Sequence, residues 1–418
     1  MGAFNKVIGY NKIKSELLEV CDMIKHPEVY EALGARLPSG VILDGAPGLG
    51  KTLLANEFIK ECGLPGFTVR RSLGSNNFIE HLTGVFDEAL RAAPSVVFLD
   101  DMDKFATEER NSEEFVVLQA KIDEVKGKGV FLIATVNDTD EIPPSLLRAG
   151  RFDRHIMVSA PTGADSERII RHYLSDKPMD KDINYSDIAK ALYGKTCAEL
   201  ESVLNAAAIS AAYQRKPRIE IGHVIGAALR EAYGITEDCD EMSELEREEI
   251  AYHEAGHALI SEVTQPGSVG LVSLTSYKRA DRGGFMLRCI EFERRAHLIL
   301  VALGGKAACE IKYGKVASGT GGDIQKAISQ LYRSATSIGT YGLASVGAGG
   351  ESENLDSRQE IVVEAELERH LFKAKEIVAE NRELLDALAH ELAEKRVLLH
   401  SDIERIRSAH SIKEVAIA

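Results

Sequence analysis

The sequence predicts an α/β domain built on a parallel sheet, followed by a domain that is mainly helical. Short apolar runs at 40–44, 95–99 and 129–135 have the length of buried strands, and polar residues follow each of them. The segment 358–412 instead carries apolar residues at three- and four-residue spacing, which is the period of an amphipathic helix. A chain of 418 residues suffices for roughly two to four domains, each with its own core.

Charge and cysteine usage narrow the class of protein. The chain carries 65 acidic residues and a net charge of −15 with no basic stripe, which argues against nucleic acid as the main partner. Its six cysteines are scattered without a C-x-x-C pair, as in reduced cytosolic proteins. Because there is no apolar run of about 18 residues and no signal-peptide pattern, we expect a soluble, cytoplasmic chain. It could still be the soluble part of a longer protein held at the cytoplasmic face of a membrane.

The first apolar strand leads into a glycine-rich loop that fits a phosphate. After helices expected at 12–24 and around 28–34, the strand 40–44 runs into a G-x-x-x-x-G-K-[ST] pattern, and a helical stretch follows from Leu53. In that context the loop N–H groups and the helix N-terminus hold phosphate, the lysine reaches the β- and γ-phosphates, and the threonine holds magnesium. A plain glycine-rich turn is the alternative, but it does not explain the complete pattern. The predicted ATP-binding residues of the loop are Gly45, Ala46, Pro47, Gly48, Leu49, Gly50, Lys51 and Thr52.

Two further strands end in side chains suited to the same nucleotide. Asp100 and Asp101 follow the strand 95–99, and Asn137 follows the strand 129–135. We expect Asp100 to bind Mg²⁺ through water and Asn137 to contact the γ-phosphate or the attacking water. Asp101 stands where such ATPases usually carry the glutamate that orients this water. Each strand alone could be a core strand with a polar end, but together they are better explained by one site for ATP with Mg²⁺.

A charged loop at 146–154 contains Arg148 and Arg151. Arginines near a phosphate can neutralise the charge that builds up in the transition state. Since Lys51 and the glycine-rich loop already serve the site of the same subunit, arginines that reach a neighbour's ATP would imply a ring. Surface ion pairs are the alternative for each arginine.

A helix in the second half carries a metal-binding pattern. His253 and His257 are four residues apart, so on a helix they lie on one face and can offer two ring nitrogens to one metal. Glu254 beside them is placed to take a proton from water, which is the H-E-x-x-H arrangement of zinc metallopeptidases. An amphipathic helix whose histidines are merely polar is the alternative.

Together these motifs resemble the FtsH family of ATP-dependent AAA+ zinc metalloproteases over nearly the whole chain. The resemblance implies an α/β AAA+ P-loop domain at 1–163, with a parallel sheet and helices on both faces. It further implies a helical lid at 164–236 and a mainly α-helical zinc metallopeptidase domain at 237–418. The expected protein is a homohexamer that uses ATP with Mg²⁺ to unfold proteins and Zn²⁺ to degrade them, with unfolded or flexible proteins as substrates.

The resemblance also assigns residues that spacing alone does not. Two histidines leave a catalytic zinc one protein ligand short. The segment 318–324 matches the family's glycine-rich turn that supplies this ligand, which makes Asp323 the third one. Glu310 resembles a residue that orients a ligand histidine, although a helix carboxylate near Lys306 would look the same. Arg148 and Arg151 resemble the family's arginine fingers.

Two expectations concern other parts of the second half. The strand expected at 283–287 resembles the family's edge strand beside the zinc, to which an extended substrate could add by main-chain hydrogen bonds. Ser401 and Glu404 read as a capping box that opens the last helix.

Three features depart from the family. Asp101 reaches about 1.5 Å less far than glutamate, so we expect slow ATP hydrolysis. The aromatic-hydrophobic-glycine triplet that threads substrate is replaced by Leu82, Thr83 and Gly84 or by Phe78 with Ile79; alternatively, Phe78 and Leu82 are core residues of the following helix. The transmembrane anchor that usually precedes the module is not in this sequence, either because it was removed or because the protein is a soluble member. A ring with weak or regulatory ATPase activity that acts as a remodeller or scaffold, and a peptidase mainly for loosely folded chains, are the alternative functions.

Overall fold

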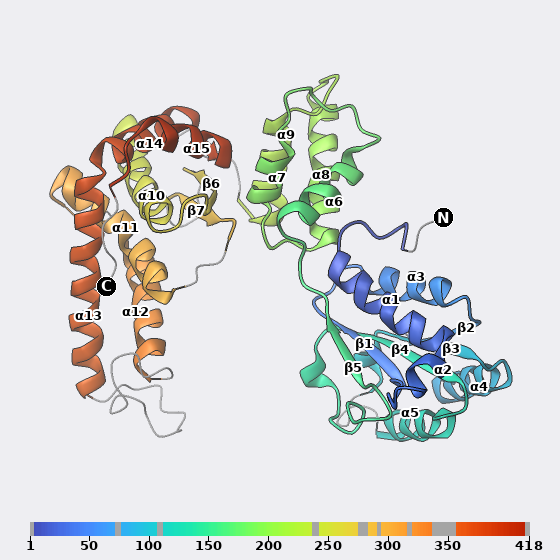
Figure 1. The fold of residues 1–418 in the computed structure, drawn as a ribbon. Helices are drawn as coiled ribbons and strands as arrows, with labels where there is room; N and C mark the ends of the chain where they lie inside the picture. The colour runs from blue at the N-terminus through green and yellow to red at the C-terminus, as the bar shows by residue number, and fades with distance from the viewer. Residues whose placement is uncertain are drawn as a thin grey trace. The chain divides into compact units, whose positions relative to one another are not determined.

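The computed structural model describes residues 4–71, 77–106, 112–235, 242–274, 283–290, 294–315, 320–336 and 357–413. They form two compact units (Figure 1). The first unit consists of Met1–Ser175 and Gly194–Glu201, and the second of Asp176–Tyr193 and Ser202–Ala418. The predicted boundaries between three domains, after 163 and after 236, stay predictions.

The first unit is built on a parallel sheet of five strands in the order β2-β3-β4-β1-β5. Because the strands are parallel, the carboxyl ends of the central ones meet at one edge, where ligands bind in such folds. The sequence did not predict β2 and β5, which are short and carry no long apolar run. The strands are β1 (Gly40–Asp44), β2 (Gly66–Arg70), β3 (Ser95–Asp100), β4 (Val130–Val136) and β5 (Arg154–Met157).

Helices cover both faces of this sheet because the strands are apolar on both faces. Val41 and Leu43 of β1 belong to the core under α1 and α3, whereas Ile42 between them belongs to the core under α4 and α5. Such continuous apolar runs are typical of parallel strands that are buried on both sides. The predicted α/β architecture is therefore confirmed. The helices are α1 (Asn11–Lys25), α3 (Lys51–Cys62), α4 (Phe78–Arg91) and α5 (Ser112–Val125), with the short α2 (Pro27–Glu31) and with α6 (Gly163–Leu174) after the sheet.

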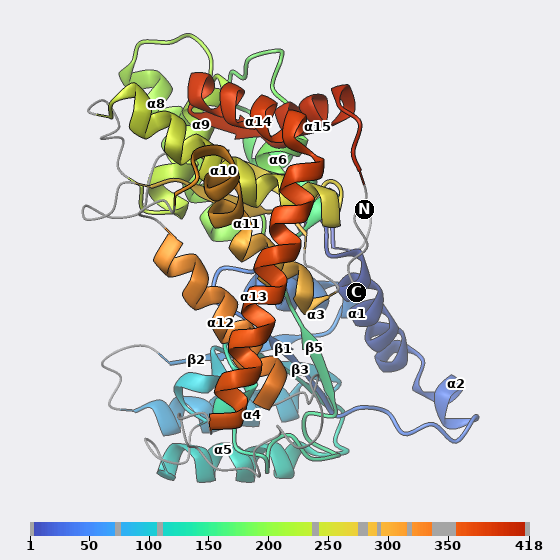
Figure 2. The ribbon, with the colours of Figure 1, turned by 90° about the vertical axis from the view of Figure 1, so that its left-hand side faces the viewer.

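The second unit is mainly helical, as predicted, and contains one small antiparallel sheet. Strand β6 (Val269–Ser273) lies between β7 (Phe285–Arg288) and β8 (Val397–Leu399). Helices α12 and α13 lie side by side (Figure 2). The helices of the unit are α7 (Tyr185–Ala191), α9 (Ile221–Ala227), α10 (Glu244–Thr264), α11 (Arg295–Tyr313), α12 (Thr320–Thr336), α13 (Ser357–Glu380), α14 (Arg382–Lys395) and α15 (His400–Ala409), together with most of α8 (Cys197–Tyr213) and a π-helical turn at Ala228–Ala232.

The C-terminal region differs from the prediction in two places. The strand β8 interrupts the predicted helical run, and it is only three residues long, too short for an alternating pattern. The predicted capping box at Ser401 and Glu404 is wrong, because the last helix begins at His400, two residues earlier than an N-cap at Ser401 would place it. The Ser401 hydroxyl instead donates to Asp187 Oδ2 at 2.5 Å, and Asp402 accepts from the Leu399 N–H at 3.1 Å.

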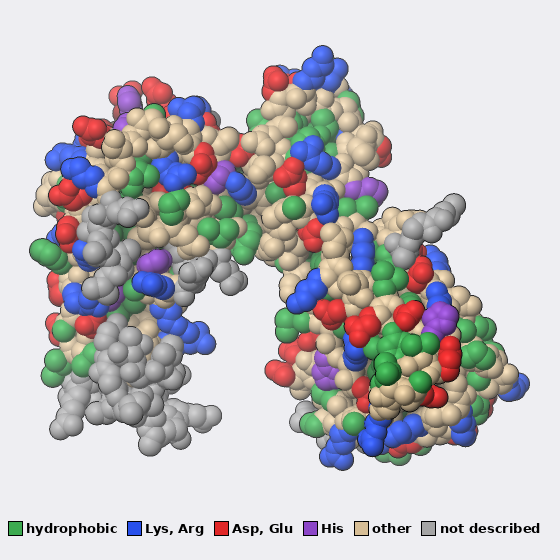
Figure 3. Space-filling view, viewed as in Figure 1, with side chains coloured by type: hydrophobic (Ala, Val, Ile, Leu, Met, Phe, Trp, Pro, Cys, Tyr) green, Lys and Arg blue, Asp and Glu red, His purple; other side chains and the backbone are tan. Residues whose placement is uncertain are grey.

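The surface carries charges of both signs. On the face drawn in Figure 3, acidic and basic side chains are interspersed over each unit. No helix among the described residues is long and apolar enough to cross a membrane.

Candidate zinc and nucleotide sites

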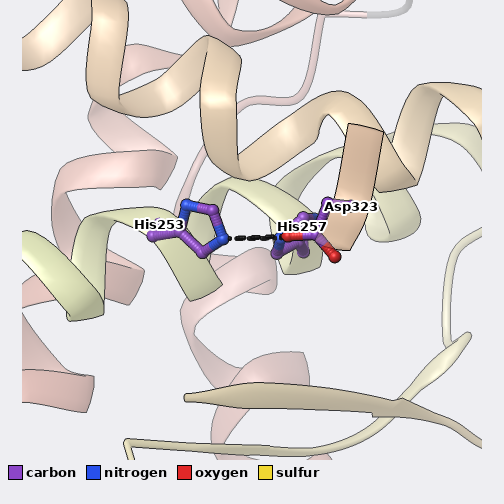
Figure 4. A group of neighbouring side chains, drawn as sticks. All are labelled: His253, His257 and Asp323. Carbon is purple, nitrogen blue, oxygen red and sulfur yellow. Dashed lines mark hydrogen bonds and ion pairs between the residues drawn. The ribbon is translucent and has the colours of Figure 1, made fainter. Parts of the chain in front are cut away.

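Two histidines and one aspartate of the second unit converge on a single point (Figure 4). His253 and His257 come from the middle of α10, and Asp323 comes from the first turn of α12. His253 Nε2 and His257 Nε2 are 3.1 Å apart, and Asp323 Oδ2 lies 3.1 Å from the first and 3.2 Å from the second. Both histidines are buried, and the aspartate is half-buried.

This arrangement fits zinc. Ligands about 2.0–2.1 Å from a tetrahedral zinc lie roughly 3.3 Å from one another, close to the three distances observed here. Two imidazoles and a carboxylate are also a common donor set for a catalytic zinc, which keeps a fourth position open. The structure therefore brings together the three predicted ligands, including the one that came only from the family resemblance.

The close approach of α10 and α11 determines where the histidines lie. A Cβ on Gly256 would lie 2.4 Å from the Gly304 carbonyl oxygen, and one on Gly304 would lie 2.6 Å from that of Gly256. Only glycine at both positions allows such a crossing. A Cβ on Gly305 would lie 2.4 Å from His253 Cε1 and 2.6 Å from His257 Nε2, so this glycine leaves room for both rings.

Sequence reasoning missed these three glycines. The adjacent Gly304 and Gly305 could have indicated this crossing. Glycine destabilises a helix interior, so two in succession within an apolar helix suggest that close packing requires them.

The two ring orientations are supported differently. His257 Nδ1 lies 2.6 Å from the Val301 carbonyl oxygen, a bond that places a proton on Nδ1 and leaves Nε2 free for a metal. His253 Nδ1 is buried and has no hydrogen-bond partner among the residues that the structure describes. Glu310 does not fill this role in the structure. It pairs with Lys306 on its own helix and with Lys375 Nζ at 2.5 Å, which agrees with the alternative that the sequence left open.

Glu254 lies beside the histidines and is 4% exposed. Burial raises the pKa of its carboxyl to about 7, although the charge of His253 and the Gly284 N–H act in the opposite direction. A carboxylate with a pKa near the working pH is suited to general-base catalysis. A Cβ on Gly284 would lie 2.5 Å from Glu254 Cγ, so glycine is needed for the segment before β7 to pass this close.

Asp323 is held as a carboxylate. Burial alone would raise its pKa, but the neighbouring His253 and His257 and the ion pair with Lys326 hold the pKa well below its usual range. Lys326 Nζ lies 2.9 Å from Asp323 Oδ1, so the other oxygen, Oδ2, faces the histidines. The sequence did not single out this lysine.

In the first unit, the glycine-rich loop connects β1 to α3 at the carboxyl edge of the sheet. Its residues Gly48 and Gly50 have φ values of 82° and 86°, which glycine adopts without strain. Lys51 Nζ donates to the Ala46 carbonyl and to Asn137 Oδ1, each at 3.0 Å. Burial lowers the pKa of Lys51, while the nearby Asp101 counteracts that shift. The predicted lysine and the predicted asparagine are therefore neighbours.

The predicted magnesium residues are also brought together. Thr52 Oγ1 donates to Asp100 Oδ1 at 2.9 Å, and Thr135 Oγ1 donates to the same oxygen at 2.9 Å. Asp101 has a φ of 53°, and its Oδ2 lies 2.6 Å from Lys104 Nζ. Asn137 Nδ2 donates to Asp103 Oδ2 at 2.8 Å. Thr135 and Asp103, which sequence reasoning did not identify, thus support the predicted residues.

The two arginines differ. Arg148 is exposed, whereas Arg151 pairs with Asp123 of α5 through two bonds of 2.9 and 2.7 Å. No sequence pattern indicates this pair, since Asp123 and Arg151 are distant along the chain.

The substrate-threading candidates lie on α4. Phe78 and Leu82 are buried in the core between this helix and the sheet. That is the placement of core residues, the alternative that the sequence left open, and neither side chain is accessible to a substrate in this structure. Thr83 and Gly84 are half-buried on the same helix. The residues just before Asn77 lie outside the described part of the chain.

Comparison with known proteins finds similarity over the segments that contain the two sites. Two protein-family models match the chain: the ATPase family associated with various cellular activities (AAA) over residues 41–160, and peptidase family M41 over residues 240–406. The ATP-dependent zinc metalloprotease FtsH of Bacillus subtilis is 31% identical over an alignment that covers 97% of this chain and 69% of that protein. ATP-dependent zinc metalloprotease FtsH 1 of Thermoanaerobacter sp. is 30% identical over an alignment that covers 99% of this chain and 74% of that protein.

A third relative, the ATP-dependent zinc metalloprotease FtsH of Ureaplasma parvum, is 31% identical over 99% of this chain. The chain spans 62% of the length of that protein and 62% of the Lactococcus lactis relative. The matches run through the nucleotide site and the zinc site alike. The chain belongs to the FtsH family of ATP-dependent zinc metalloproteases.

Proposed function

We propose that this chain is the ATPase and peptidase part of an ATP-dependent zinc metalloendopeptidase. The observation that carries the proposal is the convergence of His253, His257 and Asp323 beside the buried Glu254, in a chain that also assembles a nucleotide site. The zinc site alone would also fit a peptidase without ATPase activity. The nucleotide site alone would also fit an ATPase that remodels proteins without cleaving them. Their occurrence in one chain favours ATP-driven proteolysis.

Each residue of the zinc site has a task in peptide-bond hydrolysis. His253, His257 and Asp323 would hold the zinc, which when bound supplies a Lewis acid and lowers the pKa of a coordinated water. Glu254 accepts a proton from the attacking water and later donates it to the leaving amine, a cycle that its raised pKa supports. Lys326 keeps Oδ1 of Asp323 occupied and so orients Oδ2.

The edge strand β7 offers a place for the substrate. In the described part of the small sheet, β7 pairs with β6 on one side and forms the edge on the other. The segment that enters β7 passes Glu254 at Gly284. An extended substrate added to this edge would run past the catalytic carboxylate, held mainly by main-chain hydrogen bonds that read little side-chain identity. Such binding suits a protease that is fed with unfolded chain.

The nucleotide site would drive this feeding. Thr52 and Asp100 would hold Mg²⁺, while Lys51 and Asn137 would contact the β- and γ-phosphates. Asp101 would orient the attacking water from a shorter side chain than glutamate. We propose a homohexameric ring in which arginines of one subunit reach the ATP of the next, with unfolded or flexible proteins as substrates. The five described cysteines are free thiols, which supports a cytoplasmic location.

The experiment compares degradation of an intrinsically unstructured protein and of a tagged, stably folded protein. Each is incubated with and without ATP and with and without a zinc chelator, and Glu254→Gln and Lys51→Ala serve as matched controls. We expect the chelator and Glu254→Gln to abolish cleavage of both substrates. Cleavage of the folded substrate should also require ATP and Lys51. Absence of any chelator-sensitive cleavage would refute the peptidase.

A second candidate function has a specific observation in its favour. Asp101 is short and paired with Lys104, and Phe78 and Leu82 are buried, so the ATPase would be slow and the grip on a substrate weak. A peptidase that works mainly on loosely folded chains, or a ring that only remodels or scaffolds, would follow. Cleavage of the unstructured protein at equal rates with and without ATP would favour the former. ATP-dependent binding without cleavage would favour the latter.

A further inference from the structure

We propose that the two arginines of the charged loop do different work. Arg148 is the arginine presented to the nucleotide of a neighbouring subunit, and Arg151 is a positioning residue that fastens the loop to α5 through Asp123. This inference rests on the proposed ATPase ring. It departs from the expectation that both arginines act as fingers.

Every guanidinium nitrogen of Arg151 has a partner in its own subunit. Nε lies 2.9 Å from Asp123 Oδ1 and Nη2 lies 2.7 Å from Asp123 Oδ2, which is the bidentate geometry of a strong ion pair. Nη1 donates to the Ser145 carbonyl at 2.6 Å. The side chain is only 15% exposed. To reach a phosphate on another subunit, Arg151 would have to give up all three interactions.

The rest of the loop is also fixed from within the subunit. The Arg151 N–H donates to the Arg148 carbonyl at 3.1 Å, which closes a turn that places Arg148 at its start. Phe152 is fully buried in the core under α4 and α5. Asp153 accepts the Gly150 N–H through Oδ1 and the Ser39 N–H, at 2.6 Å, through Oδ2. These hydrogen bonds and the buried Phe152 therefore hold the backbone of the loop in one position.

Arg148 is the member of the pair that these interactions leave available. It is exposed and forms no ion pair with any residue in the described ranges. It can neutralise charge on a neighbour's phosphate without first breaking an ion pair with any residue that the structure describes. The Arg151 side chain ties the loop around Arg148 to the Ser145 carbonyl and to Asp123 of α5, so the position of Arg148 depends on both Arg151 and Asp123.

The decisive variant is Asp123→Ala, because the two readings predict opposite results for it. If Arg151 positions the loop, removing Asp123 lowers ATP hydrolysis as much as removing Arg151. If Arg151 is itself a finger, removing Asp123 releases it and leaves hydrolysis unchanged or faster. Asp123 is half exposed on the surface of α5, so the substitution leaves the core intact. Glu19→Ala is the matched control, since Glu19 forms a similar bidentate pair with Arg154, at 3.0 and 3.3 Å, in the same unit.

The measurement is steady-state ATP hydrolysis over a range of ATP concentrations, with Lys51→Ala as the baseline and sedimentation as the check on assembly. We expect Arg151→Ala and Asp123→Ala to lower the rate by the same factor, about 10- to 100-fold, without changing the ATP concentration at half-maximal rate. The double variant should be no slower than either single one. Arg148→Ala should lower the rate of ATP hydrolysis by about 10³-fold, and Glu19→Ala should hydrolyse ATP at the wild-type rate.

The rates of these variants test the role of Arg151 and the proposed ATPase activity separately. A wild-type rate for Asp123→Ala beside an impaired Arg151→Ala overturns the positioning role and makes Arg151 a finger. A double variant whose losses multiply also overturns it. A wild-type protein no faster than Lys51→Ala refutes the proposed ATPase, and this inference with it.

Discussion

The glycine at 305 offers a direct test of how the zinc site is built. A Cβ at this position would lie 2.4 Å from His253 Cε1, 2.6 Å from His253 Nδ1 and 2.6 Å from His257 Nε2, whereas ordinary contacts begin at 3.4 Å. In Gly305→Ala the rings or the helix must therefore move by about 1 Å. Zinc–ligand distances tolerate deviations of only about 0.2 Å. Because changes to residues that merely support the ligands already cost 10- to 100-fold in affinity, we expect zinc binding to weaken by about 100-fold or more.

The assay is competition for zinc against a chelator of known affinity, with circular dichroism to confirm the fold. Gly322→Ala is the control, since this glycine precedes the ligand Asp323 on α12 but has no atom of the described residues within 4 Å of where its Cβ would go. Alanine in a helix is also more favourable than glycine by up to ~1 kcal/mol, so this variant should bind zinc like the wild type. Wild-type zinc affinity in Gly305→Ala would refute the reasoning, because it would mean that α11 moves away from the histidines at no cost.

Three further predictions follow from other parts of the structure. Asp101→Glu should raise the rate of ATP hydrolysis, because the side chain gains about 1.5 Å of reach toward the attacking water; an unchanged or lower rate in a phosphate-release assay would contradict this. Leu82→Ala should lower the free energy of unfolding by about 2–5 kcal/mol in a denaturant titration, while the half-buried Thr83→Ala should change it far less; equal small losses would mean that Leu82 is not a core residue. Met286→Pro on the edge strand should slow peptide cleavage and leave ATP hydrolysis unchanged, since proline removes a main-chain donor; unchanged cleavage would mean that substrates do not pair with β7.

The sequence predicted those parts of the molecule that depend on local patterns. The apolar runs that became β1, β3 and β4 are buried on both faces, so their composition alone identified them. The pair His253 and His257 follows from the helical period. Asp323 could not be found this way, because the sequence just before α12 has no periodic pattern, and only the family resemblance supplied this residue.

Features that arise from packing between distant segments were not predictable. The bond between Arg151 and Asp123, and the supporting bond from Thr135 to Asp100, join residues that no local pattern connects. The sequence allowed two interpretations of Phe78 and Leu82, as core residues of a helix or as residues of a substrate-threading loop. Both interpretations fit apolar residues at this spacing. The packed core decides in favour of burial in this structure.

The backbone contact between Gly256 and Gly304 has a consequence for how this protein can vary. Because α10 and α11 contact each other there through main-chain atoms, the backbone determines the positions of the metal ligands, and the sizes of surrounding side chains do not. Neighbouring apolar residues can therefore be exchanged for others of similar volume without displacing the histidines. The tolerance ends at the crossing itself, where even one methyl group would force the helices apart.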